Sequence, residues 1–330
     1  MNPVERDVAP EQDAIDSTAD TAESAAMAVS GEAGASVDTA EVKQLPAEPG
    51  KRAQLETSLG QLLLQAGAIK SRDIKKIVAR QLAERLRFGD AAIQLRLINP
   101  EDLQRALARQ FSFPFMSAGD AALSRELYVA FEPLSKRTEA IRSLRTQLML
   151  RWFKDESKAL AVLEPRADSG ASALAANLAL SFAQLGERTL LIDANFRQPR
   201  QQALFGLGAE PLMGLSNVLA GRQNLKEVLR PIEPYSMLSL LCAGAPPPNP
   251  QELLGQVNFS YVIETAPSVF DVVLIDAPPV IDFADAQIIA ARATGCLLVA
   301  RRDRTRVADL QRAKVELQPT GAQLLGVVMC

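Results

Sequence analysis

The sequence predicts an α/β fold in its C-terminal half, a parallel sheet with helices on both faces, preceded by a small all-α repeat domain and a disordered N-terminal tail. Three observations predict this arrangement. Apolar runs alternate with amphipathic stretches from residue 159 onward, residues 58–110 repeat internally, and residues 1–52 are poor in aromatic residues. The length of 330 residues is sufficient for two domains and a tail.

The first 52 residues are acidic and rich in Ala, Glu, Asp and Ser. Residues 1–50 carry 11 acidic and 2 basic side chains, whereas the rest of the chain carries 28 and 34. Such a segment cannot bury enough apolar area to offset the entropy lost on ordering. We expect residues 1–52 to be a disordered acidic tail, with a docking role as the alternative. No block is rich in Lys or Arg, so we expect no nucleic-acid partner.

The composition excludes several chemistries. The chain contains no histidine, which removes imidazole bases and imidazole metal ligands. The three cysteines, Cys242, Cys296 and Cys330, lack the paired spacing of metal sites, and we expect buried thiols. No apolar run approaches the roughly 20 residues of a membrane helix, and the acidic start is unlike a secretory signal. We therefore expect a cytoplasmic protein.

Residues 58–110 contain two copies of one unit, offset by 29 residues, with ten equivalent positions. The copies begin at Ser58 and Arg87, and Gly67 of the first corresponds to Arg96 of the second. Each copy predicts a short helix, a turn and a second amphipathic helix. Two such copies can bury their apolar faces against each other.

Six apolar runs in the C-terminal half predict buried parallel strands, and four other stretches predict helices. The strands are expected at 159–163, 189–192, 237–241, 272–275, 296–300 and 324–328, and the helices at 136–151, 173–185, 284–293 and 306–317. Because alternating strands and helices favour a covered parallel sheet, we expect one domain at 136–330, after a helical domain at 53–115 and a linker at 116–135.

The first predicted strand leads into a loop and a helix, an arrangement in which backbone N–H groups and a helix N-terminus bind phosphate. In a working loop a Lys precedes the Ser or Thr and contacts the β- and γ-phosphates. Here Ala171 takes that position before Ser172, and Asp168 adds a negative charge. Taken alone, the segment favours a plain strand-to-helix turn. The candidate nucleotide-binding residues are Ser169, Gly170, Ala171, Ser172 and Arg197.

Two later strands end in aspartate, at Asp193 and Asp276. Side chains at the carboxyl ends of parallel strands face the crevice in which ligands bind. Ser172 and Asp276 are candidate ligands of Mg²⁺. Asp193 and Asp276 are the candidate catalytic residues, with Asp193 contacting a metal-bound water or accepting a substrate hydroxyl proton. The alternative is that both aspartates cap the element that follows them.

Several short motifs follow one another in a fixed order. They are Glu-x-x-Arg-x-x-Arg at 139–145, Ala-Ala-Asn-Leu-Ala at 175–179, Gly-Glu-Arg-Thr-Leu-Leu-Ile-Asp at 186–193, Arg-Gln-Pro-Arg at 197–200, Gly-Leu-Ser-Asn-Val-Leu at 214–219 and Asp-Ala-Pro-Pro at 276–279. With them, residues 139–329 resemble the bacterial tyrosine kinases of capsule and exopolysaccharide export. The resemblance implies a P-loop NTPase-like fold that uses ATP and Mg²⁺. It also implies that Glu139, Arg142 and Arg145 mediate assembly of a homo-oligomeric ring, the alternative being a solvated helix face.

Residues 58–110 resemble the small N-terminal helical domain of type II secretion and pilus ATPases, and the combination with a kinase domain is similar to the EpsG-type subgroup of chain-length determinants. Some of these helical domains bind cyclic di-GMP through an Arg-Leu-Gly start in each copy. Ser58 replaces that Arg in the first copy, and Arg96 replaces the glycine in the second. We therefore expect protein docking and weak or no cyclic di-GMP binding.

The chain departs from the kinase family at positions where the family has charged residues of the phosphate loop and the metal region. Asp-Ser-Gly-Ala-Ser at 168–172 replaces the family's Gly-Glu-Gly-Lys-Ser, Asn195 replaces an aspartate, and the tyrosines do not form a cluster. We expect a catalytically degenerate scaffold or regulatory subunit in polysaccharide chain-length control and export, with weakened ATP and Mg²⁺ binding. Its expected partner is a membrane-anchored co-polymerase or activator that holds it at the inner membrane. The alternatives are an active tyrosine kinase, with an arginine replacing the lysine, and a partition-type ATPase switch.

Overall fold

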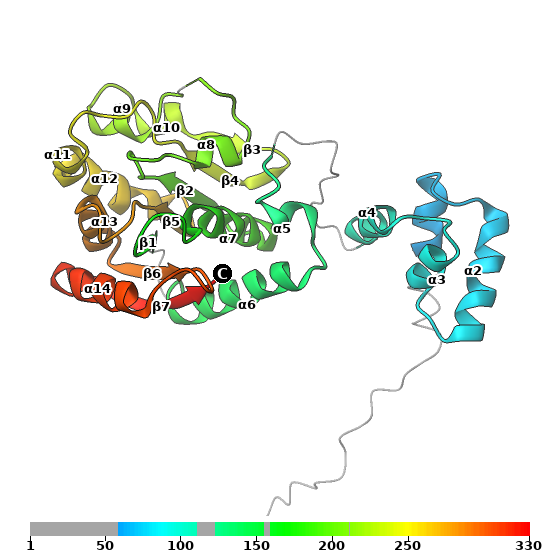
Figure 1. Ribbon diagram of the computed structural model, residues 1–330. Helices are drawn as coiled ribbons and strands as arrows, with labels where there is room; N and C mark the ends of the chain where they lie inside the picture. Colours follow the sequence, from blue (N-terminus) through cyan, green and yellow to red (C-terminus); the bar gives the residue numbers. More distant parts are fainter. Residues whose placement is uncertain (1–58, 111–122, 155–158, 211) are drawn as a thin grey trace, which may run out of the picture. The chain divides into compact units, whose positions relative to one another are not determined.

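A computed structural model describes residues 59–110, 123–154, 159–210 and 212–330, which form a helical repeat and an α/β domain (Figure 1). The expected acidic tail at 1–52 lies outside the described residues. Within the described ranges, no helix is long and apolar enough to cross a membrane.

The helical repeat contains the same two-helix unit twice, which confirms the repeat seen in the sequence. A helix at 59–65 precedes α2 (Ser71–Glu84), and α3 (Phe88–Gln94) precedes α4 (Pro100–Gln110). The turns of the two copies place Gly67 at φ 70° and Arg96 at φ 55°. Arg96 thus keeps a left-handed turn that favours glycine, at a cost of about 1–3 kcal/mol.

The two copies share one apolar core, as the amphipathic pattern predicts. Leu63 and Ile77 of the first copy are buried together with Phe88 and Ala92 of the second. Gly89 permits close packing inside this core, since a Cβ at that position would lie 2.6 Å from Cδ1 of Leu103. Each copy therefore buries its apolar face against the other, which stabilises the helices of both.

The α/β domain is built on one sheet, whose seven described strands lie in the order β3-β4-β2-β5-β1-β6-β7. The strands are β1 (Ala159–Leu163), β2 (Thr189–Asp193), β3 (Arg230–Ile232), β4 (Tyr235–Leu241), β5 (Val272–Asp276), β6 (Gly295–Ala300) and β7 (Gln323–Met329). Neighbours pair in parallel, except that β3 is antiparallel to β4. The six predicted strands are confirmed, whereas β3 was missed because it has only three residues and contains Pro231.

Helices pack on both faces of the sheet (Figure 1). They are α5 (Tyr128–Phe131), α6 (Lys136–Arg151), α7 (Ala171–Leu185), α8 (Gln201–Leu204), α9 (Leu215–Leu219), α10 (Leu225–Val228), α11 (Pro250–Gly255), α12 (Val257–Thr265), α13 (Asp285–Ala293) and α14 (Val307–Leu317), with 3₁₀ turns η1 (Ala266–Ser268) and η2 (Gln318–Thr320). The four predicted helices are confirmed, and α7 begins two residues earlier than predicted.

Alternate residues of each strand enter different cores, as the pleat of a strand requires. Leu160 and Val162 of β1 pack in the core that includes α6 and α7. Ala161 and Leu163 pack in the core that includes α11, α12 and α13. Burial on both faces explains why the strands read as continuous apolar runs.

The linker prediction at 116–135 is wrong for the described residues 123–135. Leu127 and Val129 are buried in the same core as α7. Asn177 of α7 fixes this segment, because its Oδ1 accepts from the Val129 N–H at 3.0 Å and its Nδ2 donates to the Glu126 carbonyl at 2.8 Å. The α/β domain therefore begins by residue 123.

The cysteine prediction is confirmed at two of three positions. Cys242 and Cys296 are buried, whereas Cys330 is exposed. Cys330 follows β7, whose outer edge has no neighbouring strand in the described sheet, so the core does not cover it.

Candidate nucleotide-binding site

The predicted site residues converge at one edge of the sheet because three neighbouring strands end there. β5 lies between β1 and β2, and Asp193 of β2 is the register partner of Asp276 of β5. The predicted phosphate loop leaves β1 at the same edge and leads into α7 at Ala171. The structure therefore brings together the loop and both candidate aspartates.

Asp193 is buried and accepts hydrogen bonds from the backbone that follows it. Its Oδ2 accepts from the N–H groups of Arg200 at 3.1 Å and Gln201 at 3.0 Å, and its Oδ1 accepts from Asn195 at 3.2 Å. Desolvation by burial and the nearby Asp276 carboxyl raise the pKa of Asp193, although these three hydrogen bonds oppose the rise. The capping role considered from the sequence is therefore present at Asp193.

Asp276 is equally buried but has fewer donors. Gln201 Nε2 donates to Oδ2 at 2.7 Å, while Oδ1 is buried without a hydrogen-bond partner. Burial raises the pKa of Asp276 to about 7, although hydrogen bonds from Gln201 and Ser172 lower it. Two neighbouring carboxyls in the interior favour a singly protonated pair over two negative charges.

The oxygen atoms at this edge fit a hard divalent cation. Ser172 lies close enough to Asp276 to lower the pKa of that carboxyl, and the unpartnered Oδ1 of Asp276 is a free carboxylate ligand. The described residues include no cluster of three or more His, Cys, Asp or Glu side chains suited to a metal. Mg²⁺ is commonly held by one or two protein oxygens together with substrate phosphates.

The phosphate loop differs most from a working one at Ala171. This residue is 2% exposed and belongs to the core beneath α7, so it presents no charged group at the loop. Gly170, at φ 93°, allows the sharp entry into the helix. The Ser169 N–H, which would face a phosphate, instead donates to Oε2 of Glu164 at 2.8 Å.

Glu164 and Gln201 were missed as functional residues by the sequence reasoning. Burial raises the pKa of Glu164, whereas hydrogen bonds from the backbone of Ser169, Ala171 and Gly170 lower it. The available signal for Glu164 was an acidic residue directly after the first strand, where a phosphate loop begins. No comparable signal marked Gln201, because its contact with Asp276 joins positions far apart in the chain.

The arginine predicted to bind nucleotide is engaged elsewhere. Arg197 Nε donates to Oδ2 of Asp285 at 2.9 Å, and its Nη2 donates to Oδ1 at 3.3 Å. Arg166 similarly binds Asp282 at 2.9 Å and Asp309 at 3.1 Å. The guanidinium groups of both residues are therefore held by aspartates.

A third arginine lies against the loop. Arg301 Nη1 is 3.4 Å from the carbonyl oxygen of Asp168, to which it donates. Arg301 also lines a pocket of about 480 Å³ together with Ser169 and Gly170. Arg301 is therefore one of the arginines that lie beside the predicted phosphate loop.

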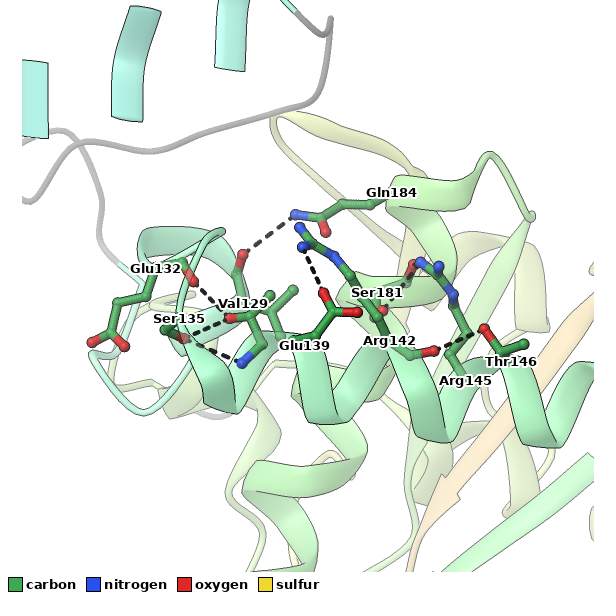
Figure 2. A network of polar contacts seen from close by, with 10 residues as sticks. Val129, Glu132, Ser135, Glu139, Arg142, Arg145, Thr146, Ser181 and Gln184 are labelled. Carbon is green, nitrogen blue, oxygen red and sulfur yellow. Dashed lines mark hydrogen bonds and ion pairs between the residues drawn. The ribbon is translucent and has the colours of Figure 1, made fainter. Parts of the chain in front are cut away.

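The three residues predicted to mediate oligomer assembly play different parts on α6 (Figure 2). Glu139 and Arg142 form an ion pair of 3.5 Å, with side chains 69% and 28% exposed. Arg145 Nη1 donates to the Ser181 carbonyl at 2.8 Å and to its Oγ at 3.3 Å. Arg145 therefore attaches α6 to α7, whereas Glu139 and Arg142 lie on the surface.

A parallel sheet with a strand-loop-helix phosphate motif and two strand-terminal aspartates defines a P-loop-type nucleotide-binding domain. No protein-family model matches the chain. Tyrosine-protein kinase YwqD of Bacillus subtilis is 32% identical over 207 residues, which cover 63% of this chain and 86% of YwqD. Tyrosine-protein kinase CpsD of Streptococcus agalactiae is 32% identical over 194 residues, 59% of this chain and 83% of CpsD. The chain belongs to this family of bacterial tyrosine kinases.

Solved structures agree with this assignment. The kinase domain of Escherichia coli tyrosine kinase ETK has a TM-score of 0.59 and 28% identity, covering 62% of this chain and 78% of that domain. The BceF tyrosine kinase domain has a TM-score of 0.57 and 29% identity, covering 70% of this chain and 97% of that domain.

One relative in sequence is much longer than the matching segment. Tyrosine-protein kinase wzc of Salmonella typhimurium is 32% identical over 204 residues, which span 28% of its length.

Proposed function

We propose that this chain is a catalytically degenerate member of the family, a scaffold or regulatory subunit in exopolysaccharide or capsule assembly. The observation that carries the proposal is Ala171, a buried methyl group where a phosphate loop has its lysine. Phosphoryl transfer depends on positioned positive charge. Removing one such preorganised group costs about 3–4 kcal/mol, or roughly 10²–10³ in rate.

In this proposal the site binds ATP and Mg²⁺ weakly. The N-terminus of α7 remains and attracts phosphate without the lysine, although the Ser169 N–H of the loop donates to Glu164. Ser172 and Asp276 would hold Mg²⁺, which neutralises phosphate charge when bound. Asp193 keeps the strand end and the start of α8 in position.

The proposed partner is a membrane-anchored co-polymerase or activator, and the chain forms a homo-oligomer through α6. The relative wzc is far longer than the segment that matches, so a kinase-like domain there is joined to further segments. No described helix of this chain can cross a membrane. We propose that a separate protein supplies the attachment to the inner membrane.

The helical repeat is proposed as a protein-docking module with weak or no affinity for cyclic di-GMP. Arg96 replaces the glycine of the repeat, and Ser58 replaces the arginine that starts a copy. Calorimetry with cyclic di-GMP is expected to show no saturable binding to the full chain. Low-micromolar affinity would contradict this part of the proposal.

The kinase test compares the wild type with Asp168→Gly combined with Ala171→Lys, each given labelled ATP, Mg²⁺ and a tyrosine peptide. We expect activity near background in the wild type and a gain of roughly 10²-fold in the repaired loop. Asp168→Gly with Ala171→Met is the matched control, because methionine adds length without charge. Wild-type phosphorylation that the repair does not improve would sink the proposal.

A second candidate function, a weak but active tyrosine kinase, is favoured by Arg301. Its guanidinium lies beside the loop at 3.4 Å from the Asp168 carbonyl, and a movement of that side chain alone would bring its charge to a bound phosphate. If the wild type transfers phosphate, Arg301→Ala should abolish the activity. Arg301→Lys should retain part of it, because a cation remains on a long side chain.

A further inference from the structure

Glu164 occupies the position of a ligand in its own loop. It follows the last residue of β1, and its Oε2 accepts from the Ser169 N–H at 2.8 Å. The backbone N–H groups of Gly170 and Ala171 lie close enough to this carboxylate to lower its pKa. Three consecutive N–H groups at the start of a 15-residue helix form the cradle that phosphate loops offer to an anion.

An external phosphate cannot use this cradle while Glu164 fills it. Each backbone N–H has one hydrogen to donate, and the Ser169 N–H donates it to the carboxylate. A phosphate at the same place would also meet a second anion at close range, where water screens their repulsion incompletely. Ala171 provides no ammonium group that could bridge the two anions.

The loop is held in this conformation from its outer side. Ser169 Oγ donates to the Arg166 carbonyl at 3.1 Å and lies 3.3 Å from Oγ1 of Thr305. Arg166 is bound in turn to Asp282 and Asp309. These contacts come from segments before α13 and in α14, so release of Glu164 does not by itself open the loop.

The carboxyl of Asp276 is likewise hydrogen-bonded by a side chain of the protein itself. Gln201 Nε2 donates to Oδ2 of Asp276 at 2.7 Å and to the Ser172 carbonyl at 3.0 Å. This amide lies against the residues that would hold a cation. Oδ1 of Asp276 nevertheless remains buried without a hydrogen-bond partner. An unpaired buried oxygen of this kind indicates a ligand site at this edge of the sheet, and Gln201 satisfies only one of the two Asp276 oxygens.

We propose that the Glu164 carboxylate is an internal ligand of the phosphate loop, which takes the place of a nucleotide phosphate and decides which anions the loop accepts. Glu164 is thus a specificity-determining residue that weakens the binding of di- and triphosphates. This inference rests on the proposed function, because it explains how a loop without lysine stays closed, but it makes a separate prediction about binding.

The test measures anion binding by the full-length chain. Wild type, Glu164→Ala and Glu164→Gln are titrated by calorimetry with inorganic pyrophosphate and with ADP, and their thermal unfolding is followed over the same concentrations. We expect Glu164→Ala to bind both probes more tightly than wild type, on the order of tenfold. Glu164→Gln is expected to lie between them, since its amide oxygen can still accept from the loop without a charge.

Asp168→Asn is the matched control. It removes one negative charge from the same loop, and asparagine tolerates the φ of 70° at this position. A gain in anion affinity that is confined to the Glu164 variants indicates that the Glu164 carboxylate occupies the phosphate site. An equal gain in Asp168→Asn indicates a general charge effect and overturns the inference. Glu164→Gln keeps the test valid if loss of the cap unfolds Glu164→Ala.

The two proposals can fail separately. If Glu164→Ala gains affinity while the wild type phosphorylates a tyrosine peptide, the degenerate-kinase proposal falls and the internal-ligand inference stands. If neither Glu164 variant gains affinity while the wild type is inactive, the inference falls and the degenerate-kinase proposal stands.

Discussion

The two ends of β5 carry aspartates in opposite electrostatic situations. Asp271, just before the strand, is half-exposed and bound by Arg188 through a contact of 2.6 Å, which lowers its pKa. Asp276, the last residue of the strand, is buried without an opposite charge at hydrogen-bonding distance, and its pKa rises to about 7. A paired carboxylate stabilises the fold, whereas a buried carboxyl without a cation is retained at a cost.

Asp285 shows that burial alone does not leave an aspartate without a cationic partner. Its side chain is 1% exposed, as deeply buried as Asp276, yet it forms two hydrogen bonds with Arg197. The fold therefore provides a cation for one buried aspartate and not for the other. This contrast favours a ligand role for Asp276 and a structural role for the Arg197–Asp285 pair.

The largest expected effect comes from leaving Asp285 without its cation. Arg197→Met keeps most of the side-chain volume and removes the charge. We expect a loss of about 3 kcal/mol in the free energy of unfolding, because an uncompensated buried carboxylate remains. Denaturant unfolding of the full chain measures the loss.

Arg166→Met is the control for Arg197→Met. Arg166 also binds aspartates, but its side chain is 49% exposed, so its removal should cost at most about 1 kcal/mol. Equal losses in the two variants would contradict the distinction between a buried and an exposed pair.

Asp276→Asn is expected to raise stability at pH 7 by on the order of 1–3 kcal/mol, measured in metal-free buffer. The folded-state pKa of about 7 lies above the unfolded value of 3.8. The native state therefore binds more protons between these values, and wild-type stability falls as pH rises from about 4 to 7. Asp276→Asn should flatten that slope.

Asp193→Asn is the matched control on the adjacent strand. Both oxygens of Asp193 accept from backbone N–H groups, and the NH₂ of an asparagine cannot accept a hydrogen bond. This variant should lose stability. A gain of similar size in both variants would show that the two aspartates are not distinguished by their donors.

Much of the fold follows from the sequence because its signals are local. Apolar runs predict the six parallel strands, and the motif order predicts which strand ends carry Asp193 and Asp276. The strand β3 lacks such a run. The segment at 123–135 was misassigned because Asn177 holds it through contacts between residues about 50 positions apart, which no periodicity reveals.

The site could be predicted only in part, for the same reason. Residue type and position identify the loop and the missing lysine at Ala171. The roles of Glu164 and Gln201 depend on which backbone N–H groups and carboxyls the fold places beside them. A side chain that replaces a ligand has the same chemistry as the groups that would bind that ligand, so the sequence does not distinguish the two roles.

The α6 surface offers a comparison between Arg142, which is paired with Glu139 of the same helix, and Arg145, which is bound to α7. Arg142→Glu should reduce the mass of the assembly measured by light scattering, because the surface charge that can pair with a neighbouring copy is reversed. Arg145→Glu should lower the thermal stability of the chain, because Arg145 is bound to Ser181 of α7. A wild type that is always monomeric, or an unchanged mass in Arg142→Glu, would contradict assembly through α6.

The smallest expected effect lies at the paired end of β5. Asp271→Asn removes a carboxylate whose pKa is lowered, first by its hydrogen bond with the Arg188 side chain. A lowered pKa contributes stability that is present above the unfolded value of 3.8 and is lost as pH falls through the folded value. The variant should therefore be slightly less stable than wild type at pH 7, within the small range of exposed ion pairs, and the difference should vanish once the pH falls below the lowered folded value. Added salt should also reduce it. Because Asp276→Asn is expected to change stability in the opposite direction, thermal unfolding of both variants over one pH series tests the contrast directly. A destabilisation by both substitutions at pH 7 would show that Asp276, like Asp271, is retained for stability and not for a ligand.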